Sequence, residues 1–344
     1  MGRIPTKTET DQKPVTAAAR NPSQAVRLRL SVLIVNYRDW PATERLVGEL
    51  WQADLVKGKR AEIVIVDNDS PPDSATFRLQ QRPGVTICFR PRNEGFARAV
   101  NFGVERSRGD WLLLLNPDVE ARSNFLDGVL TMLDRVAPDD GLIGLRLQNP
   151  DGTTQPSVGL TPTIWSTLFG MFRARAQRKC HVLQGKHPCR VAWVTGCGML
   201  IRRSCFEMIG GFDSDFFLYY EDLDLAMRAR AAQWRVLWTP TPSIVHRHPL
   251  HSRAVPPRLR LLTRQALLTY SRKHWSVIAT TGLAGIILIE SFVRSWRHRR
   301  DKESLATFRH LRRLAWEFLI GRSRNGYQRA WEIAQGGRRD VRMA

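Results

Sequence analysis

The sequence predicts an α/β protein with a mostly parallel central sheet and helices on both of its faces. Short apolar or β-branched segments alternate with segments of helical periodicity, and each apolar segment ends at polar or turn-forming residues. This alternation is typical of folds whose strands are buried on both sides of the sheet. Hydrophobic residues make up 43% and charged residues 25% of the 344 residues, which excludes an intrinsically disordered chain.

The predicted elements follow one another from the N-terminal end. Strands are expected at residues 28–37, 62–66, 85–89 and 111–115, and helices at residues 42–52, 93–106 and 124–136. Residues 193–203 are expected to form a strand with a bend at small residues. A helix is expected to begin at Glu221. It is followed by a predicted strand at residues 234–238, which leads to His246, His248 and His251. The chain carries neither a GxGxxG nor a GxxxxGK[ST] motif, so neither a dinucleotide fold nor a P-loop is expected.

Polar residues stand directly after three of the predicted strands. Asn36 and Tyr37 follow the first strand, residues 67–70 follow the second, and Asn116 and Asp118 follow the fourth. Ligands of α/β sheets bind beyond the carboxyl ends of the parallel strands. We therefore expect these three groups to converge at one edge of the sheet and to form a ligand site there.

Eight motifs, taken in order, resemble those of the family 2 glycosyltransferases, in particular the bacterial rhamnosyltransferase-like branch. They lie around His246 and at residues 31–37, 62–70, 93–103, 111–119, 196–203, 210–213 and 216–228. The resemblance implies a GT-A fold, a nucleotide-sugar donor, a divalent metal and inversion at the anomeric carbon. It favours a dTDP-deoxysugar such as rhamnose, with UDP-sugars left open. The implied acceptor is a hydroxyl of a saccharide or lipid-linked acceptor in cell-surface polysaccharide synthesis.

Two residues resemble the metal ligands of this family. Asp118 occupies the last position of the Asp-x-Asp motif, whose first position is Asn116 here, and His246 resembles a ligand from the far side of the domain. A divalent cation offsets the charge that develops on the leaving nucleoside diphosphate. Because Mg²⁺ and Mn²⁺ take oxygen ligands and Mn²⁺ also accepts imidazole, the resemblance implies one of these two ions. The alternative for Asp118 is a turn residue that follows a strand.

The resemblance also implies where the donor binds. Asp67 resembles the aspartate that accepts a hydrogen bond from the pyrimidine base, a role that suits a carboxylate because charge-assisted bonds are strong. The other implied donor-binding residues stand at strand ends or at the start of the third helix, where an N-terminus can face phosphate; they are Asn36, Tyr37, Asn68, Arg92, Asn93, Gly95 and Asn116. Arg98, one turn further on, is equally compatible with a solvated surface position.

Inversion in a single displacement needs one general base for the acceptor hydroxyl. Asp222 matches the aspartate of the family's Glu-Asp motif and is the implied base, with Glu221 as its acceptor-orienting neighbour. Asp224 and Arg228, four residues apart on one helix, are expected to form a structural ion pair. Acidic residues also stabilise helix N-termini, which is the alternative for these carboxylates. A catalytically inactive nucleotide-sugar or carbohydrate-binding relative is the alternative function.

The formal charge of +21 is concentrated at the C-terminal end. From residue 258 onward the chain has 19 Lys and Arg and 6 Asp and Glu, whereas the preceding residues contain 34 and 26. We therefore expect a disordered leader at 1–28, a GT-A domain at 29–255 and a basic helical extension at 256–344. Apolar residues recur at helical spacing from Leu305 to Leu319. This helix either packs on the catalytic domain or lies on an anionic membrane surface as a basic amphipathic helix.

The sequence favours a cytoplasmic protein, with binding to the inner face of the membrane as a hypothesis and no nucleic-acid partner. The N-terminal residues lack the apolar region of a secretory signal, although Gly2 and Thr6 fit the short myristoylation pattern. The apolar residues 277–289 end at Glu290, which predicts a buried or interfacial helix more than a membrane span. An ordinary loop is expected around four residues whose spacing is unlike that of structural zinc sites, Cys180, His181, His187 and Cys189.

Overall fold

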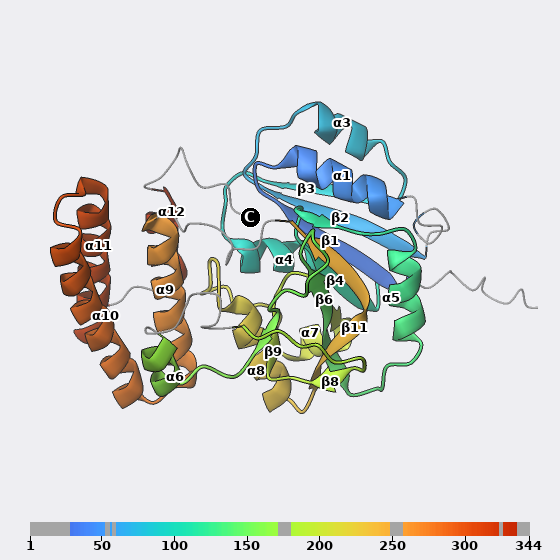
Figure 1. Ribbon diagram of the computed structural model, residues 1–344. Helices are drawn as coiled ribbons and strands as arrows, with labels where there is room; N and C mark the ends of the chain where they lie inside the picture. Colours follow the sequence, from blue (N-terminus) through green and yellow to red (C-terminus); the bar gives the residue numbers. More distant parts are fainter. Residues whose placement is uncertain are drawn as a thin grey trace, which may run out of the picture.

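The computed structural model describes residues 28–51, 56, 60–170, 180–247, 257–322 and 326–335. The chain folds around a nine-stranded mixed sheet, and helices from its C-terminal part stand beside the sheet domain (Figure 1). Several predicted features lie outside the described residues. They are the leader up to residue 27 with Gly2 and Thr6, the boundary at residues 255–256, and the histidines His248 and His251.

The first half of the sheet is parallel, as predicted. β1 (Leu30–Asn36), β2 (Ala61–Asn68), β3 (Val85–Arg90) and β4 (Trp111–Leu115) lie in the order β3-β2-β1-β4. They are connected through α1 (Trp40–Trp51), α3 (Ser74–Gln80) and α4 (Phe96–Val104). The sequence patterns did not indicate α3, a short helix whose start is stabilised by a capping box between Asp73 and Thr76.

The second half of the sheet begins with a reversal of direction. β10 (Met199–Arg202) runs antiparallel to both β4 and β6 (Asp140–Gln148), and β11 (Arg235–His246) then runs parallel to β6. The short strands β5 (Val119–Glu120) and β8 (Cys189–Arg190) pair antiparallel with β11. The long ladders are thus parallel, and the prediction of a mostly parallel sheet is confirmed. The predicted strand at 193–203 is two strands, because β9 (Trp193–Val194) pairs with β7 (Val158–Gly159) in a separate small sheet.

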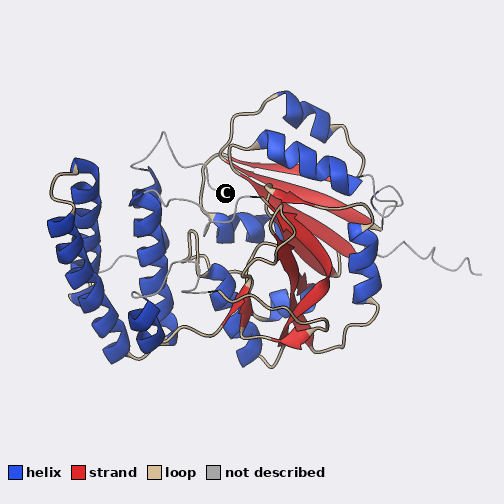
Figure 2. Ribbon diagram, viewed as in Figure 1, coloured by secondary structure: helices blue, strands red, loops and turns tan. Residues whose placement is uncertain are grey.

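Helices cover both faces of the sheet because successive strand residues point to opposite sides (Figure 2). Val32 and Ile34 of β1 belong to the core beneath α1, α3 and α5 (Phe125–Leu133). Leu33 belongs to the opposite core layer, with α4, α7 (Arg203–Met208) and α8 (Glu221–Ala231). These two layers place the carboxyl ends of β1, β2 and β4 at one common edge.

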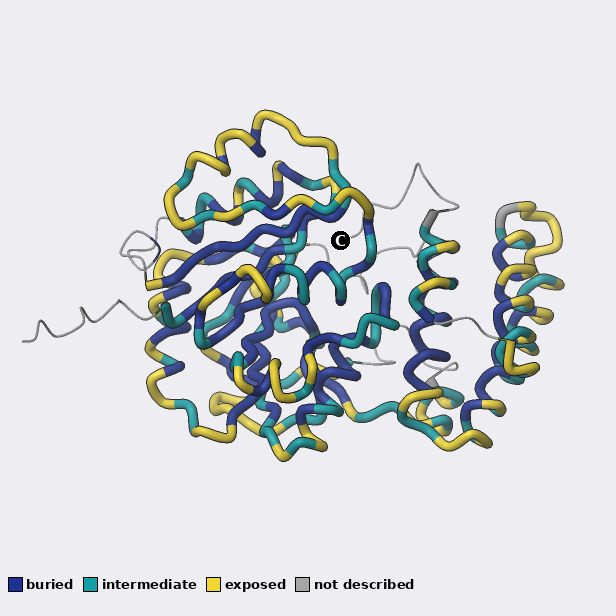
Figure 3. The backbone as a smooth tube through the Cα atoms, turned by 180° about the vertical axis from the view of Figure 1, so that it is seen from behind, coloured by how far each residue is buried: buried dark blue, intermediate teal, exposed yellow. Residues whose placement is uncertain are grey.

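The C-terminal helices form an additional layer. They are α9 (Pro257–His274), α10 (Val277–Arg297), α11 (Lys302–Leu319) and α12 (Gly326–Gln335). Ala266 and Tyr270 of α9 belong to the same buried cluster as α8, so α9 is continuous with the core of the sheet domain. α10 and α11 form the outermost layer of this part of the molecule, with much of their surface exposed, and α6 (Ile164–Gly170) contacts α10 (Figure 3).

Two expectations for the basic part of the chain, and one for Arg98 of α4, can be compared with the structure. The apolar side of residues 305–319, with Phe308 and Leu311, is buried against neighbouring helices, so this helix packs on the protein and its apolar side does not face a membrane. α10 is partly buried, with 28% of its most apolar window covered, and among the described residues it is the helix long and apolar enough to cross a membrane, by length and composition only; its interfacial position stays a prediction. Arg98 is half-buried and engaged within the protein, because its guanidinium lies 3.8 Å from the ring centroid of Tyr327 and its Nε donates to the Ser214 carbonyl.

Candidate active site

The ends of β1 and β2 are joined by a buried hydrogen-bond network. Asn36 donates from Nδ2 to Asp67 Oδ1 at 2.8 Å and accepts from the Thr43 hydroxyl at 2.8 Å. The Ser70 amide donates to Asp67 Oδ2 at 2.9 Å. Burial raises the pKa of the Asp67 carboxyl above its usual value, and the hydrogen bonds from Ser70 and Asn36 offset part of this effect. The predicted base-recognition residue is therefore a rigidly oriented acceptor with 1% of its surface exposed.

A second network holds the loop before α4. Asn68 Nδ2 donates to Asn93 Oδ1 at 2.8 Å, and Asn93 Oδ1 also accepts the Gly95 amide at 3.0 Å. Gly95 has φ +88° and lies against Phe217, whose carbonyl accepts the Phe96 amide at 2.7 Å. The two predicted asparagines thus brace this loop through contacts within the protein.

The remaining predicted donor-binding residues are less buried. Tyr37 is half-buried and stacks with the Arg38 guanidinium at 5.2 Å, and Asn116 is half-buried after β4. Arg92 is exposed and lines a cavity of about 490 Å³ between this loop and α12, together with Glu94, Tyr327, Gln328, Trp331 and Glu332. Arg92 therefore faces α12, on a different side of the loop from the buried Asn68–Asn93 contact.

The pairing of β5 with β11 places the two predicted metal ligands, Asp118 and His246, next to each other. β5 pairs with the end of β11, with Val119 opposite His246, and this places His246 Nε2 at 3.4 Å from Asp118 Oδ2. Asp118 is 5% exposed, and neither of its carboxylate oxygens has a hydrogen-bond partner in the described part of the chain. A group of three or more His, Cys, Asp or Glu suited to a metal ion does not occur among the described residues, so Asp118 and His246 form a pair and not a larger cluster.

Gln155 fixes the orientation of the His246 ring. Its Nε2 donates to the His246 carbonyl at 2.6 Å, so its Oε1, 3.0 Å from Nδ1 of the ring, accepts a hydrogen bond from the N–H of that nitrogen. In the neutral imidazole Nε2 then carries the lone pair, and this lone pair faces Asp118. Two electron-rich atoms facing each other in a buried site fit a cation between them, or a proton on Nε2. No sequence motif pointed to Gln155.

Asp222 is the second residue of α8, which begins directly after two left-handed residues. Tyr219 and Tyr220 have φ values of +71° and +67°, a conformation that costs a non-glycine residue about 1–3 kcal/mol. The Asp222 carboxylate accepts the Leu223 amide at 2.8 Å and the Gly196 amide at 3.3 Å. Asp222 and its neighbour Glu221 are both buried. Strain of this kind is tolerated where it aims a functional side chain.

The bend at residues 195–198 connects Asp222 to the region of Asp118 and His246. Gly196 bonds to Asp222, and the Gly198 amide donates to the Leu114 carbonyl at the end of β4 at 3.0 Å. Between them lies Cys197, where burial and the nearby Asp118 carboxylate raise the pKa of the thiol well above its usual value. The bend thus brings Asp222 and Asp118 to one edge of the sheet.

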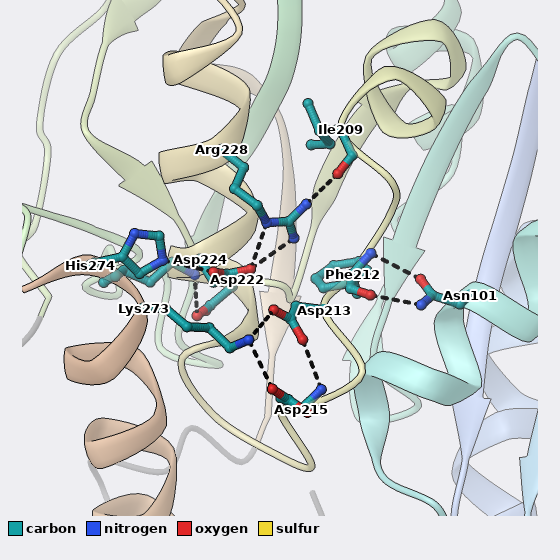
Figure 4. Close-up of polar contacts among 11 residues, drawn as sticks. Asn101, Ile209, Phe212, Asp213, Asp215, Asp222, Asp224, Arg228, Lys273 and His274 are labelled. Atoms are coloured by element: carbon teal, nitrogen blue, oxygen red, sulfur yellow. Dashed lines mark hydrogen bonds and ion pairs between the residues drawn. The ribbon is translucent and has the colours of Figure 1, made fainter. Parts of the chain in front are cut away.

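Asp224, two residues after the predicted base, forms the predicted ion pair with Arg228 and a hydrogen bond with His274. Arg228 Nε donates to Asp224 Oδ2 at 2.8 Å, and His274 Nε2 of α9 lies 2.7 Å from Asp224 Oδ1 (Figure 4). Asp224 is 1% exposed, so its charge is balanced inside the protein. The contact to α9 is not apparent from the sequence, because it joins helices in two regions that the sequence analysis treats as separate.

Several curated proteins similar to this chain are named as sugar transferases. The chain is 27% identical over 312 residues to the N-acetylglucosaminyl-diphospho-decaprenol L-rhamnosyltransferase of Mycobacterium tuberculosis, covering 82% of this chain and 99% of that one. It is 27% identical to the low-salt glycan biosynthesis hexosyltransferase Agl10 of Haloferax volcanii, covering 64% and 68%. It is 21% identical to the dTDP-rhamnosyl transferase RfbF of Shigella flexneri, covering 64% and 74%.

Solved structures of glycosyltransferases share the fold. GalNAc-T7 with UDP, GalNAc and Mn²⁺ aligns with a TM-score of 0.54 and 16% identity, covering 85% of this chain and 56% of that one. The mannosyltransferase PcManGT of Pyrobaculum calidifontis, in complex with GDP-Man and Mn²⁺, aligns with a TM-score of 0.50 and 17% identity, covering 96% and 92%. These likenesses confirm the predicted GT-A fold.

Sequence profiles agree with this fold. The profile of Glycosyl transferase family group 2 matches residues 152–321, which reach into the C-terminal helices. The profile of Glycosyl transferase family 2 matches residues 31–209, more than half of the chain. The chain with this edge of buried carboxylates therefore belongs to glycosyl transferase family 2.

Proposed function

We propose that this protein moves a deoxysugar such as rhamnose from a nucleoside-diphosphate donor to a hydroxyl of a lipid-linked saccharide, with inversion at the anomeric carbon. The observation that carries the proposal is the bend at residues 195–198, which connects Asp222 to the Asp118–His246 pair. An ionised carboxylate accepts a proton but has none to donate, so Asp222 is suited to remove the acceptor proton. Glu221, beside it, orients the acceptor.

Asp118 and His246 would hold a divalent cation, Mg²⁺ or Mn²⁺. Their chemistry fits this ion, because the buried Asp118 oxygens lack hydrogen-bond donors and the ring nitrogen of His246 is turned toward them. The structures of GalNAc-T7 and PcManGT contain Mn²⁺, which supports a metal here. When bound, such a cation offsets the negative charge of the leaving diphosphate.

The proposed donor is dTDP-linked. Asp67, oriented by Asn36 and Ser70, suits a ligand that donates an N–H, as thymine and uracil do at N3. The relatives from M. tuberculosis and S. flexneri are a rhamnosyltransferase acting on a diphospho-decaprenol and a dTDP-rhamnosyl transferase. These names support a dTDP-deoxysugar and an acceptor that carries a polyprenyl diphosphate.

Transfer assays with Asp222→Asn test the proposed base. We expect transfer from dTDP-rhamnose to fall by about 10²–10⁴-fold, the contribution of a general base, while the dissociation constant for dTDP stays within about twofold. Asp134→Asn is the control, since this carboxylate is 60% exposed and pairs with Arg29 away from the bend. Wild-type transfer by Asp222→Asn, or a product with the donor's anomeric configuration, would contradict the proposal.

We also propose that this cytoplasmic enzyme binds the anionic inner face of the membrane through the C-terminal helices. Ile278, Ile289, Phe292 and Trp296 are between 58% and 86% exposed and share one side of α10, opposite the buried Leu283 and Ile287. Outward-facing arginines extend this surface at the end of α10 and on α11, Arg297, Arg299, Arg300, Arg309 and Arg313. An apolar side flanked by arginines suits an anionic interface, where a lipid-linked acceptor resides.

A further inference from the structure

We propose that α9 is a positioning element of the transfer reaction, because its last turn holds the strained turn from which Asp222 projects. The proposal rests on the assignment of Asp222 as the base and goes beyond it. It gives a catalytic role to part of the basic extension at residues 256–344, which the sequence analysis separates from the GT-A domain. Lys273, His274 and Tyr270 are the positioning residues.

Two polar residues of α9, Lys273 and His274, bind the chain on both sides of the turn. Lys273 Nζ lies 2.7 Å from Asp213 Oδ2 and 2.9 Å from Asp215 Oδ2, both of which precede the turn. His274 Nε2 donates to Asp224 Oδ1 at 2.7 Å, after the turn. Figure 4 shows these contacts reaching from α9 toward the residues around Asp222. Residues 216–223, including the base, are thus held between two fixed points.

An aromatic contact supports the turn itself. Tyr220, one of the two left-handed residues, has its ring centroid 5.6 Å from that of Tyr270, which is fully buried on α9. Tyr270 also packs on His274 at 4.7 Å and edge-on against Trp275 at 6.3 Å. A left-handed conformation at a bulky residue persists only where the surrounding packing enforces it. The packing here comes from α9.

The geometry predicts the effect of releasing the turn. Without α9, Arg228 alone would hold Asp224, and Tyr219 and Tyr220 would be able to leave the left-handed region. A displacement of a catalytic group by about 1 Å lowers a rate by on the order of 10²-fold. The Asn36–Asp67 network, which holds the proposed base-recognition carboxylate, involves no residue of α9, so donor binding should change little.

Steady-state kinetics of full-length variants test this role. We expect His274→Ala and Lys273→Met to lower kcat at least tenfold while KM for the nucleotide-sugar changes less than about twofold. His274→Gln keeps an N–H for Asp224 and should recover most of kcat. The matched control is Arg264→Met, which removes an ion pair of 2.8 Å between α9 and Glu290 of α10 and should lower thermal stability without lowering kcat.

A double variant separates positioning from general destabilisation. If His274 acts through Asp222, then His274→Ala should cause no further loss of residual transfer in the Asp222→Asn background. A further loss there, an equal fall of kcat in Arg264→Met, or a folded His274→Ala with wild-type kcat would each overturn the role of α9. Full activity of Asp222→Asn would overturn the base assignment itself, which distinguishes the two failures.

Discussion

Replacing Gly95 with alanine tests whether the loop before α4 must approach the segment that leads to Asp222 as closely as the structure shows. An ideal Cβ at Gly95 would lie 2.4 Å from the Phe217 carbonyl oxygen and 2.8 Å from its Cα. Both atoms belong to the backbone, so no side-chain rotation relieves the overlap. Gly95 also has φ +88° and ψ 168°, a region almost confined to glycine.

The expected destabilisation is the sum of two effects. Placing alanine in this backbone conformation costs about 1–3 kcal/mol, and overpacking against the rigid neighbour costs about 1–3 kcal/mol more. Gly152→Ala is the matched control, since Gly152 has φ +85° but no heavy atom within 4 Å of an added Cβ. We therefore expect Gly95→Ala to lower the free energy of unfolding by about 2–6 kcal/mol. Gly152→Ala should lower it only by the cost of the backbone conformation, about 1–3 kcal/mol.

Urea unfolding followed by tryptophan fluorescence measures both variants, and calorimetric titration with dTDP reports on the loop in the folded protein. Gly95→Ala should also weaken dTDP binding, because the loop that Asn93 braces must move away from Phe217. Equal destabilisation by the two variants would refute the inferred close approach.

Three further predictions concern other parts of the molecule. Asp118→Ala should reduce the gain in donor affinity on addition of Mn²⁺ at least tenfold in calorimetry, and an unchanged metal response would contradict the ligand assignment. Although burial alone would raise the pKa of Asp213, the Lys273 hydrogen bond holds it below the usual 3.8, and the pKa of Lys273 is raised above 10.5. The ion pair therefore stabilises the fold at pH values between the pKa of Asp213 and the pKa of Lys273, and this stabilisation is lost as the pH falls through the lowered pKa of Asp213. The difference in unfolding midpoint between wild type and Lys273→Met should shrink as the pH is lowered from about 5 to about 2. Replacing Phe292 and Trp296 with serine should reduce the fraction of protein that sediments with anionic vesicles at least fivefold. The control is Phe77→Ser, at a residue that is 62% exposed on α3, which should not change this fraction. An equal loss of sedimentation in both variants would argue against a binding surface on α10.

The sequence predicts the parallel half of the sheet closely because its signals are local. The strand at Trp111–Leu115 coincides with its predicted bounds, since an uninterrupted apolar run there is limited on both sides by polar residues. The convergence of Asn36 and Asp67 also follows from the order of elements, and their contact at 2.8 Å confirms it. Helix ends differ by a few residues, as at Phe96–Val104, because Gly95 and its contact with Phe217 fix where α4 begins.

Contacts set by tertiary packing could not be predicted. Gln155 reaches His246 across 91 residues, and nothing in the residues around this glutamine indicates a partner. His274 reaches Asp224 in the same way, from the basic extension that the charge distribution sets apart from the GT-A domain. The periodicity of residues 305–319 identified an apolar side correctly, but what covers this side is decided by the neighbouring helices. Periodicity in the sequence thus identifies the apolar side of a helix, but only the tertiary fold shows which other element packs against it.

The pairing of β5 with β11 has a consequence for the order in which the site is assembled. Glu120 and Arg247, which form an ion pair beside Asp118 and His246, are separated by 127 residues, whereas the Asn36–Asp67 contact spans 31. Contacts between distant residues form late, and the N-terminal part of a chain leaves the ribosome first. The Asn36–Asp67 network, to which we assign nucleotide recognition, therefore forms while the Asp118–His246 pair, the proposed metal ligands, still awaits β11. Free nucleotide in the cell, by binding this early half, would stabilise it through mass action and act as a folding ligand for a chain still being synthesised.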